Sequence, residues 1–424
     1  MLTKEISQEY IKILKEELVP AMGCTEPIAL AFGGAKAREI LGTIPDSVVA
    51  RCSGNMIKNV RCVTIPNSDY LVGIEAGVTL GIVAGNAEKK MEVLKDVTKE
   101  DIQMTKKLLQ NDFCKVELLE TSIPLHIQLE LKRGEQTVVL EICHAHTNIT
   151  SIRKNGIELF KKEEHIREDG TFGKRELLTL EGIKEFADTI DLQLVKDIIE
   201  PQMECNMKIA EEGLKGGYGL GIGKVLKEAY PECITTKIKS YTASASEARM
   251  GGCDLPVVIN SGSGNQGITS SVPVIVYAKE NNIPEEIMYR GLLFSNLLTV
   301  YQKSFIGKLS AFCGVVSASC SSAAAITYIS GYPMENIKMT IANTLANIPG
   351  IICDGAKISC AAKIASSLDA ALMAHNLSIR NKVYSPNSGI LKNNIKDTIS
   401  CVGHIGKDGM RQTDYEILKV MLEG

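Results

Sequence analysis

The spacing of apolar residues predicts two helices at the start of the chain. Apolar side chains recur every three to four positions, as on one face of an amphipathic helix, at Ile6, Tyr10, Ile11, Leu14 and Leu18. Pro20 ends this run, and Gly23–Pro27 is expected to form a turn. An Ala-rich second helix is then expected from Ile28 to Ile40.

Between residues 46 and 160 the pattern changes to short β-branched runs near Gly, Asp or Asn turns. Five of these runs predict strands, at Ser47–Cys52, Arg61–Ile65, Lys115–Glu120, His126–Lys132 and Gln136–Cys143. Arg133-Gly134-Glu135 separates the last two runs and predicts a hairpin turn. Helical patterns at Ala76–Gly85 and Thr98–Leu109 alternate with the strands, so this stretch is expected to form an α/β module.

From about residue 175 the chain is expected to be helical almost throughout. The helix candidates are Glu181–Asp188, Asp191–Gly213, Pro284–Tyr301, Leu309–Ile329 and Met334–Ala346. The charged stretch Lys161–Lys174 is the predicted linker. The whole pattern predicts an α+β fold, in which a largely helical catalytic domain (residues 1–45 and 175–424) carries an inserted α/β domain (residues 46–174).

Composition excludes several classes of protein. With 424 residues, 45% of them hydrophobic and 23% charged, the chain is expected to be globular rather than disordered. Its 47 Lys and Arg against 50 Asp and Glu, and the absence of Trp, argue against nucleic acid or a membrane surface as a partner. The stretch 309–330 carries no charge, but its many Ser, Cys and Thr residues favour a buried helix over a membrane span.

Cysteine is unusually frequent, and this bears on the compartment. The chain has 13 cysteines, an odd number that favours free thiols over a paired framework. The first twenty residues are charged and amphipathic, without the apolar run of a secretion signal. A reducing, cytoplasmic location is therefore expected.

Four cysteines in the C-terminal half are candidate ligands of an iron–sulfur cluster: Cys313, Cys320, Cys353 and Cys360. Cys313 and Cys320 are expected on one unbroken helix, where seven residues at about 1.5 Å each separate them by about 10.5 Å, so only one of them can join a cluster. Breaks at Pro349-Gly350 and Asp354-Gly355 let a loop bring Cys353 back toward Cys360 at the next helix start. The same spacing also fits small buried side chains in a helix pack.

A glycine-rich segment, Ser261-Gly262-Ser263-Gly264-Asn265-Gln266-Gly267, is a second candidate site. Its glycines let backbone amides approach a phosphate or carboxylate closely. The segment resembles the phosphate loop of fold-type-II pyridoxal-phosphate enzymes, but no lysine context identifies a Schiff-base residue. A tight loop between helices is the alternative interpretation.

Two further segments carry candidate chemistry. In Gly23–Pro27, a helix N-terminus would lower the pKa of the Cys24 thiol, which could act as a base, nucleophile or ligand, while Glu26 could be an acid/base group or only a helix N-terminal charge. His144 and His146 are expected on one face of a strand, as a metal pair would be, although no third ligand is evident. Asn55 and Lys58 could contact an anionic substrate or belong to a turn.

Taken together, these segments resemble the L-cysteine desulfidase family, which is related to the iron–sulfur L-serine dehydratase α chain. The matching motifs, in order, are GCTEPIALA at 23–31, SGNMIKNV at 53–60, HTNI at 146–149, EARMGGCDLPVVINSGSGNQGI at 247–268, KLSAFCGVVSASCSSAAA at 308–325, NIPGIICDGAKISCAAKIASSLDAA at 347–371 and GMRQTD at 409–414. They extend over essentially the whole chain.

The resemblance implies a 4Fe–4S lyase that eliminates hydrogen sulfide from L-cysteine to give pyruvate and ammonia. The family's cluster ligands correspond to Cys313, Cys353 and Cys360, and three protein ligands leave one iron open as a Lewis acid. By the same resemblance Cys24 is the α-proton base or a transient fourth ligand, with Glu26 as a second catalytic group. The substrate contacts implied by the matching motifs are Thr25, Asn55, Lys58, His146, Asn148, Arg249, Ser261, Ser263 and Asn265.

Other functions stay open on the sequence alone. L-serine dehydratase on the same scaffold, a pyridoxal-phosphate lyase, and a non-catalytic iron–sulfur sensor or binding protein are the alternatives. The expected partners are a small amino acid (L-cysteine or L-serine) and, for a homodimer, a second copy of the chain.

Overall fold

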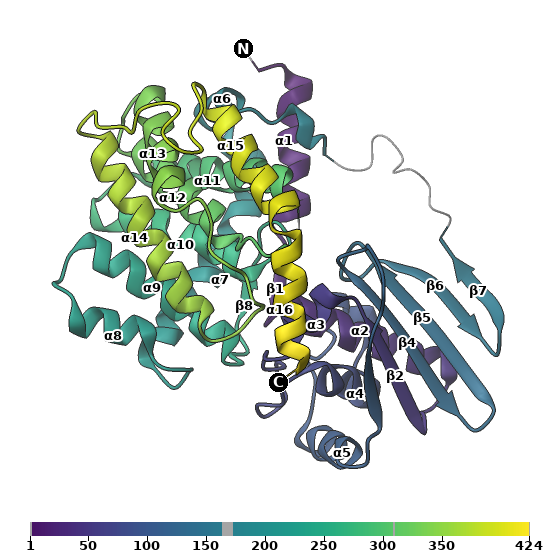
Figure 1. Ribbon diagram of the computed structural model, residues 1–424. Coiled ribbons are helices and arrows are strands. Elements are labelled where there is room, and N and C mark those ends of the chain that lie inside the picture. The colour runs from purple at the N-terminus through teal and green to yellow at the C-terminus, as the bar shows by residue number, and fades with distance from the viewer. Residues whose placement is uncertain (1, 163–172, 308–309, 424) are drawn as a thin grey trace.

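A computed structural model describes residues 2–162, 173–307 and 310–423 of the chain. It has an α+β fold, with a large helical body beside a smaller sheet-containing body (Figure 1). The two bodies have separate hydrophobic cores. The predicted linker at Lys161–Lys174 falls mostly on residues 163–172, which lie outside the described residues.

The two N-terminal helices belong to different cores. Helix α1 (Lys4–Glu17), capped by Thr3, buries Tyr10 and Leu14 in the core of the helical body. Strand β1 (Pro20–Met22) then pairs with β8 (Pro256–Val258) of that body. Helix α2 (Thr25–Leu41) is buried along most of its length and packs in the core of the sheet-containing body. The two cores therefore do not divide at residue 45, because the apolar Ala-rich surface of α2 is covered by the sheet.

The smaller body is built on one six-stranded sheet. Its strands are β2 (Ser47–Cys52), β3 (Cys114–Leu118), β4 (His126–Arg133), β5 (Gln136–Cys143), β6 (Ile149–Lys154) and β7 (Ile157–Lys161), in the spatial order β3-β2-β4-β5-β6-β7. Strands β2 and β3 are parallel, and the other neighbours are antiparallel. Helices α2 and α4 (Ile74–Ala84) pack together, and α2 lies on β4 and β5. The helix α5 (Lys99–Leu109) begins after Thr98, as its capping box predicts.

The predicted strand at Arg61–Ile65 is wrong. Residues 61 and 62 form a turn after the short helix α3 (Gly54–Val60), and only Thr64 makes an isolated bridge, to Val72. Val63 and Ile65 are nevertheless buried. Their β-branched, apolar character reflects burial in an irregular segment rather than strand pairing.

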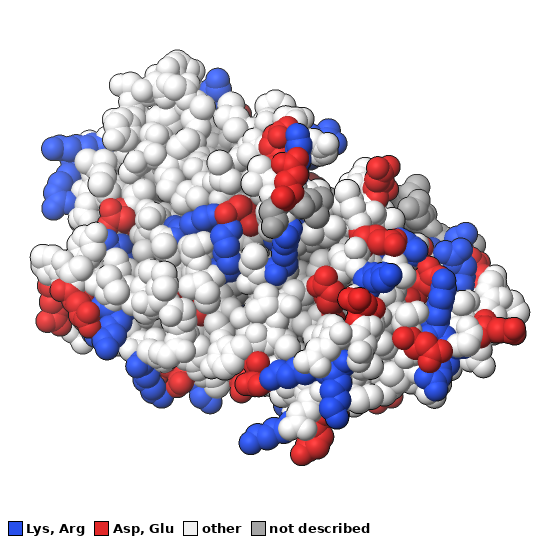
Figure 2. All heavy atoms as spheres, turned by 60° about the horizontal axis from the view of Figure 1, so that its bottom comes forward, with Lys and Arg blue, Asp and Glu red and all other residues white. Residues whose placement is uncertain are grey.

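The larger body is a pack of helices rich in small residues. Its main helices are α6 (Leu180–Thr189), α7 (Lys196–Lys215), α8 (Ile222–Ala229), α9 (Ile234–Met250), α10 (Gly264–Glu280), α11 (Glu285–Ile306), α12 (Val315–Ile329), α13 (Met334–Asn347), α14 (Cys360–Ser378), α15 (Ile395–His404) and α16 (Arg411–Glu423). Helix α16 runs down the junction of the two bodies (Figure 1). In the face shown by Figure 2, much of the helical body is uncharged, whereas Lys, Arg, Asp and Glu crowd together on the sheet-containing body.

Helix α12 explains the uncharged stretch at 309–330. Its hydroxyls bond to carbonyls one turn back, as Ser321 Oγ does to Ser317 O (2.8 Å) and Thr327 Oγ1 to Ala323 O (3.0 Å), so the helix satisfies their donors while they are buried. No helix of the described residues is long and apolar enough to cross a membrane. The expected start at Leu309 lies outside the described residues. The helix begins at Val315, because residues 311–313 pair with residues 351–353 instead of joining it.

His375 makes the stability of this helix pack depend on pH. It is buried on α14, where its Nδ1 lies 2.8 Å from Thr327 Oγ1, and burial lowers its pKa to about 4. Between pH 4 and 6.5 the unfolded chain would bind a proton that the folded chain excludes, so this residue's contribution to stability falls as pH falls through that range. We predict that His375→Asn removes about 2 kcal/mol of the destabilisation seen between pH 7 and pH 5. Thermal unfolding of both proteins at the two pH values measures this, and an identical pH dependence would contradict it.

Candidate functional site

Two of the predicted cluster cysteines are brought together by a short antiparallel pairing. Phe312 bridges Ile352, the Cys313 amide donates to Ile351 O (2.9 Å), and the Cys353 amide donates to Ala311 O (2.7 Å). The Cys313 and Cys353 side chains lie in hydrogen-bonding contact. Cys313 therefore precedes α12 instead of sharing that helix with Cys320, so the expectation of an unbroken helix through both residues is wrong.

Cys360 joins the same region from the start of α14. It is the first residue of that helix, as the breaks in the sequence predicted, and its Sγ lies 3.8 Å from Gly355 O. Gly355 has a φ of +95° and lies against the Lys58 backbone so closely that a Cβ there would overlap it. Only glycine lets the 353–360 loop approach α3 in this way. Cys320 instead lies on α12 beside Thr344 and Gln302.

Lysines surround these thiols. The hydrogen bond from Cys313, followed by the charges of Lys58 and Lys363, holds the pKa of Cys353 below its ordinary value against burial, and the same contact raises the pKa of Cys313. Burial lowers the pKa of Lys303 to about 8, although the charges of Cys353 and Cys313 oppose this shift. One proton shared between two thiols, with cations nearby, is an environment that stabilises thiolate.

The chemistry of Cys313, Cys353 and Cys360 fits an iron–sulfur cluster, because thiolates are the ligands of such clusters. In the parts of the chain that are described, no group of three or more His, Cys, Asp or Glu side chains is placed to hold one metal ion. In a 4Fe–4S cluster each thiolate binds a different iron, so the thiols need not converge on one point. Three thiols whose charges act on one another, among lysines, therefore fit an anionic cluster in kind.

The turn at residues 23–26 lies beside this cysteine site. Cys24, Val63 and Met250 form a small buried cluster against which Ala356, Ile358 and Cys360 pack. Cys24 is the N-cap residue of α2, and its Sγ donates to Glu26 Oε2 at 3.1 Å. The early motif and the third cluster cysteine, 336 positions apart in sequence, thus share one contact region.

Glu26 is a buried carboxylate with several donors. Thr25 Oγ1 donates to Oε2 (2.9 Å), and Asn59 Nδ2 donates to Oε1 (3.3 Å). Burial favours the neutral acid, but the charge of His146 and the bonds from Cys24 and Thr25 hold its pKa below the ordinary value. Burial and the Glu26 charge raise the pKa of the Cys24 thiol, so the lowering expected from a helix N-terminus is outweighed.

Arg249 is a buried cation on the other side of the turn. It is 2% exposed, its Nε donates to Gly23 O (2.9 Å), and one terminal nitrogen donates to Asn265 Oδ1 (3.2 Å). None of the described carboxylates lies within ion-pair distance of it. Burying a charge without a counter-ion is costly, so Arg249 is suited to an incoming anion.

The glycine-rich segment forms a tight turn into α10. Asn260 and Ser263 exchange two backbone hydrogen bonds, and Ser261 Oγ donates to Asn260 Oδ1 (2.8 Å). Gly262 O accepts from Thr25 Oγ1 (3.2 Å), which ties the segment to the early turn. Gly264 lies so close to the Arg249 guanidinium that a side chain there would displace it. The motifs at 23–26 and 261–265 therefore form one site with Arg249.

The segment that contains His144 and His146 is not part of a strand, contrary to the prediction. His144 and His146 follow the end of β5 in a turn, so the expected strand pair is wrong. His146 does reach the site: its charge acts on Glu26, and its Cε1 lies 3.8 Å from the Cβ position of Gly262. Asn148 instead bonds to Cys143 O (2.8 Å) within its own loop and accepts from Lys162.

Asn55 and Lys58 face the C-terminal helix. Asn55 Nδ2 donates to Asp414 Oδ2 (3.1 Å), and Lys58 forms an ion pair with Asp414 on α16. Lys58 is almost fully buried and its charge acts on Cys353, so it borders the cysteine site without being free to bind substrate. Sequence reasoning missed Asn59, Lys303 and Asp414, although Asn59 and Asp414 stand inside or at the end of motifs that it quoted.

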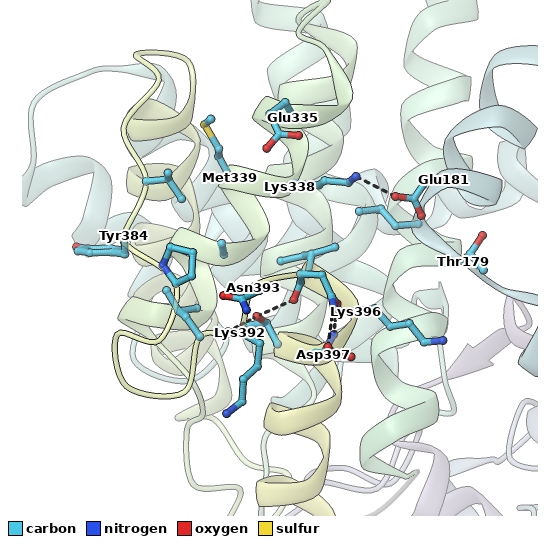
Figure 3. Close-up of a pocket in the computed structure, with 18 of the residues that line it drawn as sticks. Thr179, Glu181, Glu335, Lys338, Met339, Tyr384, Lys392, Asn393, Lys396 and Asp397 are labelled. Atoms are coloured by element: carbon cyan, nitrogen blue, oxygen red, sulfur yellow. Dashed lines mark hydrogen bonds and ion pairs between the residues drawn. The ribbon is translucent and has the colours of Figure 1, made fainter.

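A cavity lies away from the candidate site. It measures about 620 Å³ and is lined by α6, α13, α15 and the loop before α15. Figure 3 shows Lys338 paired with Glu181 on one side, with Lys392, Lys396 and Asp397 near the start of α15. None of the residues predicted for the site lines it.

Comparisons with known proteins agree on one family. The model of the "Serine dehydratase alpha chain" family matches residues 88–419. A "UPF0597 protein" of Lachnoclostridium phytofermentans is 47% identical over 98% of this chain and 99% of its own length. A "UPF0597 protein" of Treponema denticola is 44% identical over 100% of this chain and 99% of its own length.

The Lys58–Asp414 pair gives a prediction about α16. Replacing Asp414 by Asn leaves a buried ammonium without its carboxylate, which costs about 2 to 4 kcal/mol, and it loosens α16 from α3. Hydrogen exchange should therefore increase in residues 411–423. Asp408→Asn is the matched control, because its pair with His404 is exposed and contributes little. Equal exchange in the two variants would contradict the prediction.

Proposed function

Because the chain belongs to the serine dehydratase alpha-chain family, a family of lyases, we propose that it is an L-cysteine desulfidase. It would eliminate hydrogen sulfide from L-cysteine, giving pyruvate and ammonia, with a 4Fe–4S cluster. The resemblance of its ordered motifs to L-cysteine desulfidases supports this substrate. The family match alone supports a lyase acting on a small amino acid.

The proposal rests mainly on one observation: four cysteine side chains and an arginine without a counter-ion lie in one region. Cys313, Cys353, Cys360 and Cys24 come from three separate stretches, and Arg249 borders the same turn. The unpaired Arg249 offers a counter-charge for a substrate carboxylate. An α-amino acid held there would have its side chain near the cysteines.

Each group then has a role. Cys313, Cys353 and Cys360 would hold the cluster, which supplies a Lewis acid that makes a thiol a better leaving group. Arg249, with the Asn265 side chain and the Ser261–Ser263 turn beside it, would orient the substrate carboxylate. The His146 charge and the bonds from Cys24 and Thr25 keep the pKa of Glu26 low, so Glu26 would be present as the carboxylate that accepts the α-proton. Cys24 is placed to relay that proton to Glu26 Oε2.

L-serine dehydratase is the second candidate, and the name of the matched family favours it. The two functions share the carboxylate and proton-accepting groups and differ in the leaving group. We predict that anaerobically reconstituted protein releases pyruvate with a higher kcat/KM from L-cysteine than from L-serine, with one sulfide formed for each pyruvate. A higher kcat/KM for L-serine would make the protein a serine dehydratase, and no pyruvate from either amino acid would contradict a lyase.

The assignment of ligands gives a second prediction. Ser in place of Cys313, Cys353 or Cys360 should abolish both iron retention after anaerobic reconstitution and sulfide release from L-cysteine. Cys320→Ser is the matched control, because Cys320 is buried on α12 but does not face the other thiols, and it should retain iron and activity. Full iron content in any of the first three variants, or its loss in the control, would contradict the assignment.

A further inference from the structure

Gln266 is a buried side chain with an unused hydrogen-bond acceptor. It lies in the first turn of α10, is 6% exposed, and its enclosed Oε1 has no hydrogen-bond partner in the described part of the chain. Its neighbour Asn265, in contrast, accepts from Ser246 Oγ (3.0 Å) and Arg249 (3.2 Å). Buried acceptors are nearly always satisfied, so this exception calls for a donor that the folded chain does not supply.

The carboxamide of Gln266 lies between the two halves of the site. A Cβ at Gly314 would be 2.5 Å from Gln266 Cδ and 2.6 Å from Oε1, so the carboxamide rests directly on the backbone that follows Cys313. The neighbouring residue in the same turn of α10, Asn265, accepts a hydrogen bond from Arg249. Because Gly314 has no side chain, the Gln266 carboxamide fits next to Cys313. It is also one residue away from Asn265, which bonds to Arg249.

The chemistry of an α-amino acid identifies the missing donor. In the proposed function, which this inference presupposes, the substrate carboxylate pairs with Arg249 and its thiol is directed to the cysteines. The remaining group is the ammonium, a strong donor that needs an acceptor. Glu26 already accepts from Cys24, Thr25 and Asn59, so its oxygens are largely engaged. Oε1 of Gln266 is the acceptor left over.

We propose that Gln266 Oε1 accepts a hydrogen bond from the substrate's α-ammonium, and that Gln266 therefore selects amino acids over thiol acids without an amine. A neutral amide suits this position, because a carboxylate beside Cys313 would oppose the negative charge of the thiolates. The hydrogen bond would fix the substrate's Cα between Arg249 and the cysteines.

Two thiols that each lack one substrate group test this inference. Cysteamine carries the ammonium but no carboxylate, and 3-mercaptopropionate carries the carboxylate but no ammonium. Their Kd values are measured by calorimetry on anaerobically reconstituted protein of equal iron content. Gln266→Met should weaken cysteamine binding about 10-fold or more, as expected for a hydrogen bond to a charged group, and leave 3-mercaptopropionate within about twofold.

Gln302→Met is the matched control. Gln302 is equally buried, but its carboxamide is used within the fold, donating to Ser317 O (3.2 Å) and Ser321 Oγ (2.8 Å). It should lower Tm and leave the ratio of the two Kd values unchanged. Equal weakening of both thiols by Gln266→Met, or of neither, would overturn the inference while leaving sulfide release from L-cysteine intact. Selective binding without sulfide release would contradict the desulfidase proposal alone, and a wild type that binds neither thiol would contradict both.

Discussion

The site depends on the pairing of residues 311–313 with residues 351–353. Two backbone hydrogen bonds hold Cys313 outside α12 and place it against Cys353. The chain between these stretches forms two helices, α12 and α13, which fold back on each other and on α14. This pairing brings both thiols within reach of the charges of neighbouring lysines, Lys303 and Lys58 among them.

The remaining parts of the site are positioned by contacts between the two bodies. Helix α2 packs on the sheet, but Thr25 at its start bonds to Gly262 O in the turn before α10. Gly23, just before α2, accepts a hydrogen bond from Arg249 of α9. Within the sheet-containing body, His146 reaches Glu26 of α2 from the end of β5. The third contact between the two bodies is the ion pair of Lys58 on α3 with Asp414 on α16. It holds α16 against α3, which also contacts the 353–360 loop. Polar side chains of the site such as Thr25, Lys58 and Arg249 are thereby buried where the two bodies meet.

Local features were predictable where a single rule governed them. Strands β2, β4 and β5 alternate buried and less buried residues, and their predicted bounds agree with the structure to within one residue. The apolar pattern failed at Arg61–Ile65, where β-branched residues are buried in an irregular segment. It also failed at Cys313, where pairing with a distant segment takes the place of the expected helix. The motifs indicated the residues of the site, but the contacts of Lys58 with Asp414, and of Gln266 with Gly314, join positions far apart in sequence that no local spacing encodes.

We propose that Cys313, Cys353 and Cys360 hold one cluster beside the Cys24 turn, with one iron left for the substrate. Mössbauer spectroscopy of protein reconstituted anaerobically with ⁵⁷Fe, before and after addition of L-cysteine, tests it most directly. We predict the spectrum of a 4Fe–4S cluster, in which a single iron changes its environment when L-cysteine is added. Iron bound only as mononuclear species, or a cluster whose four irons are all unaffected by L-cysteine, would contradict it.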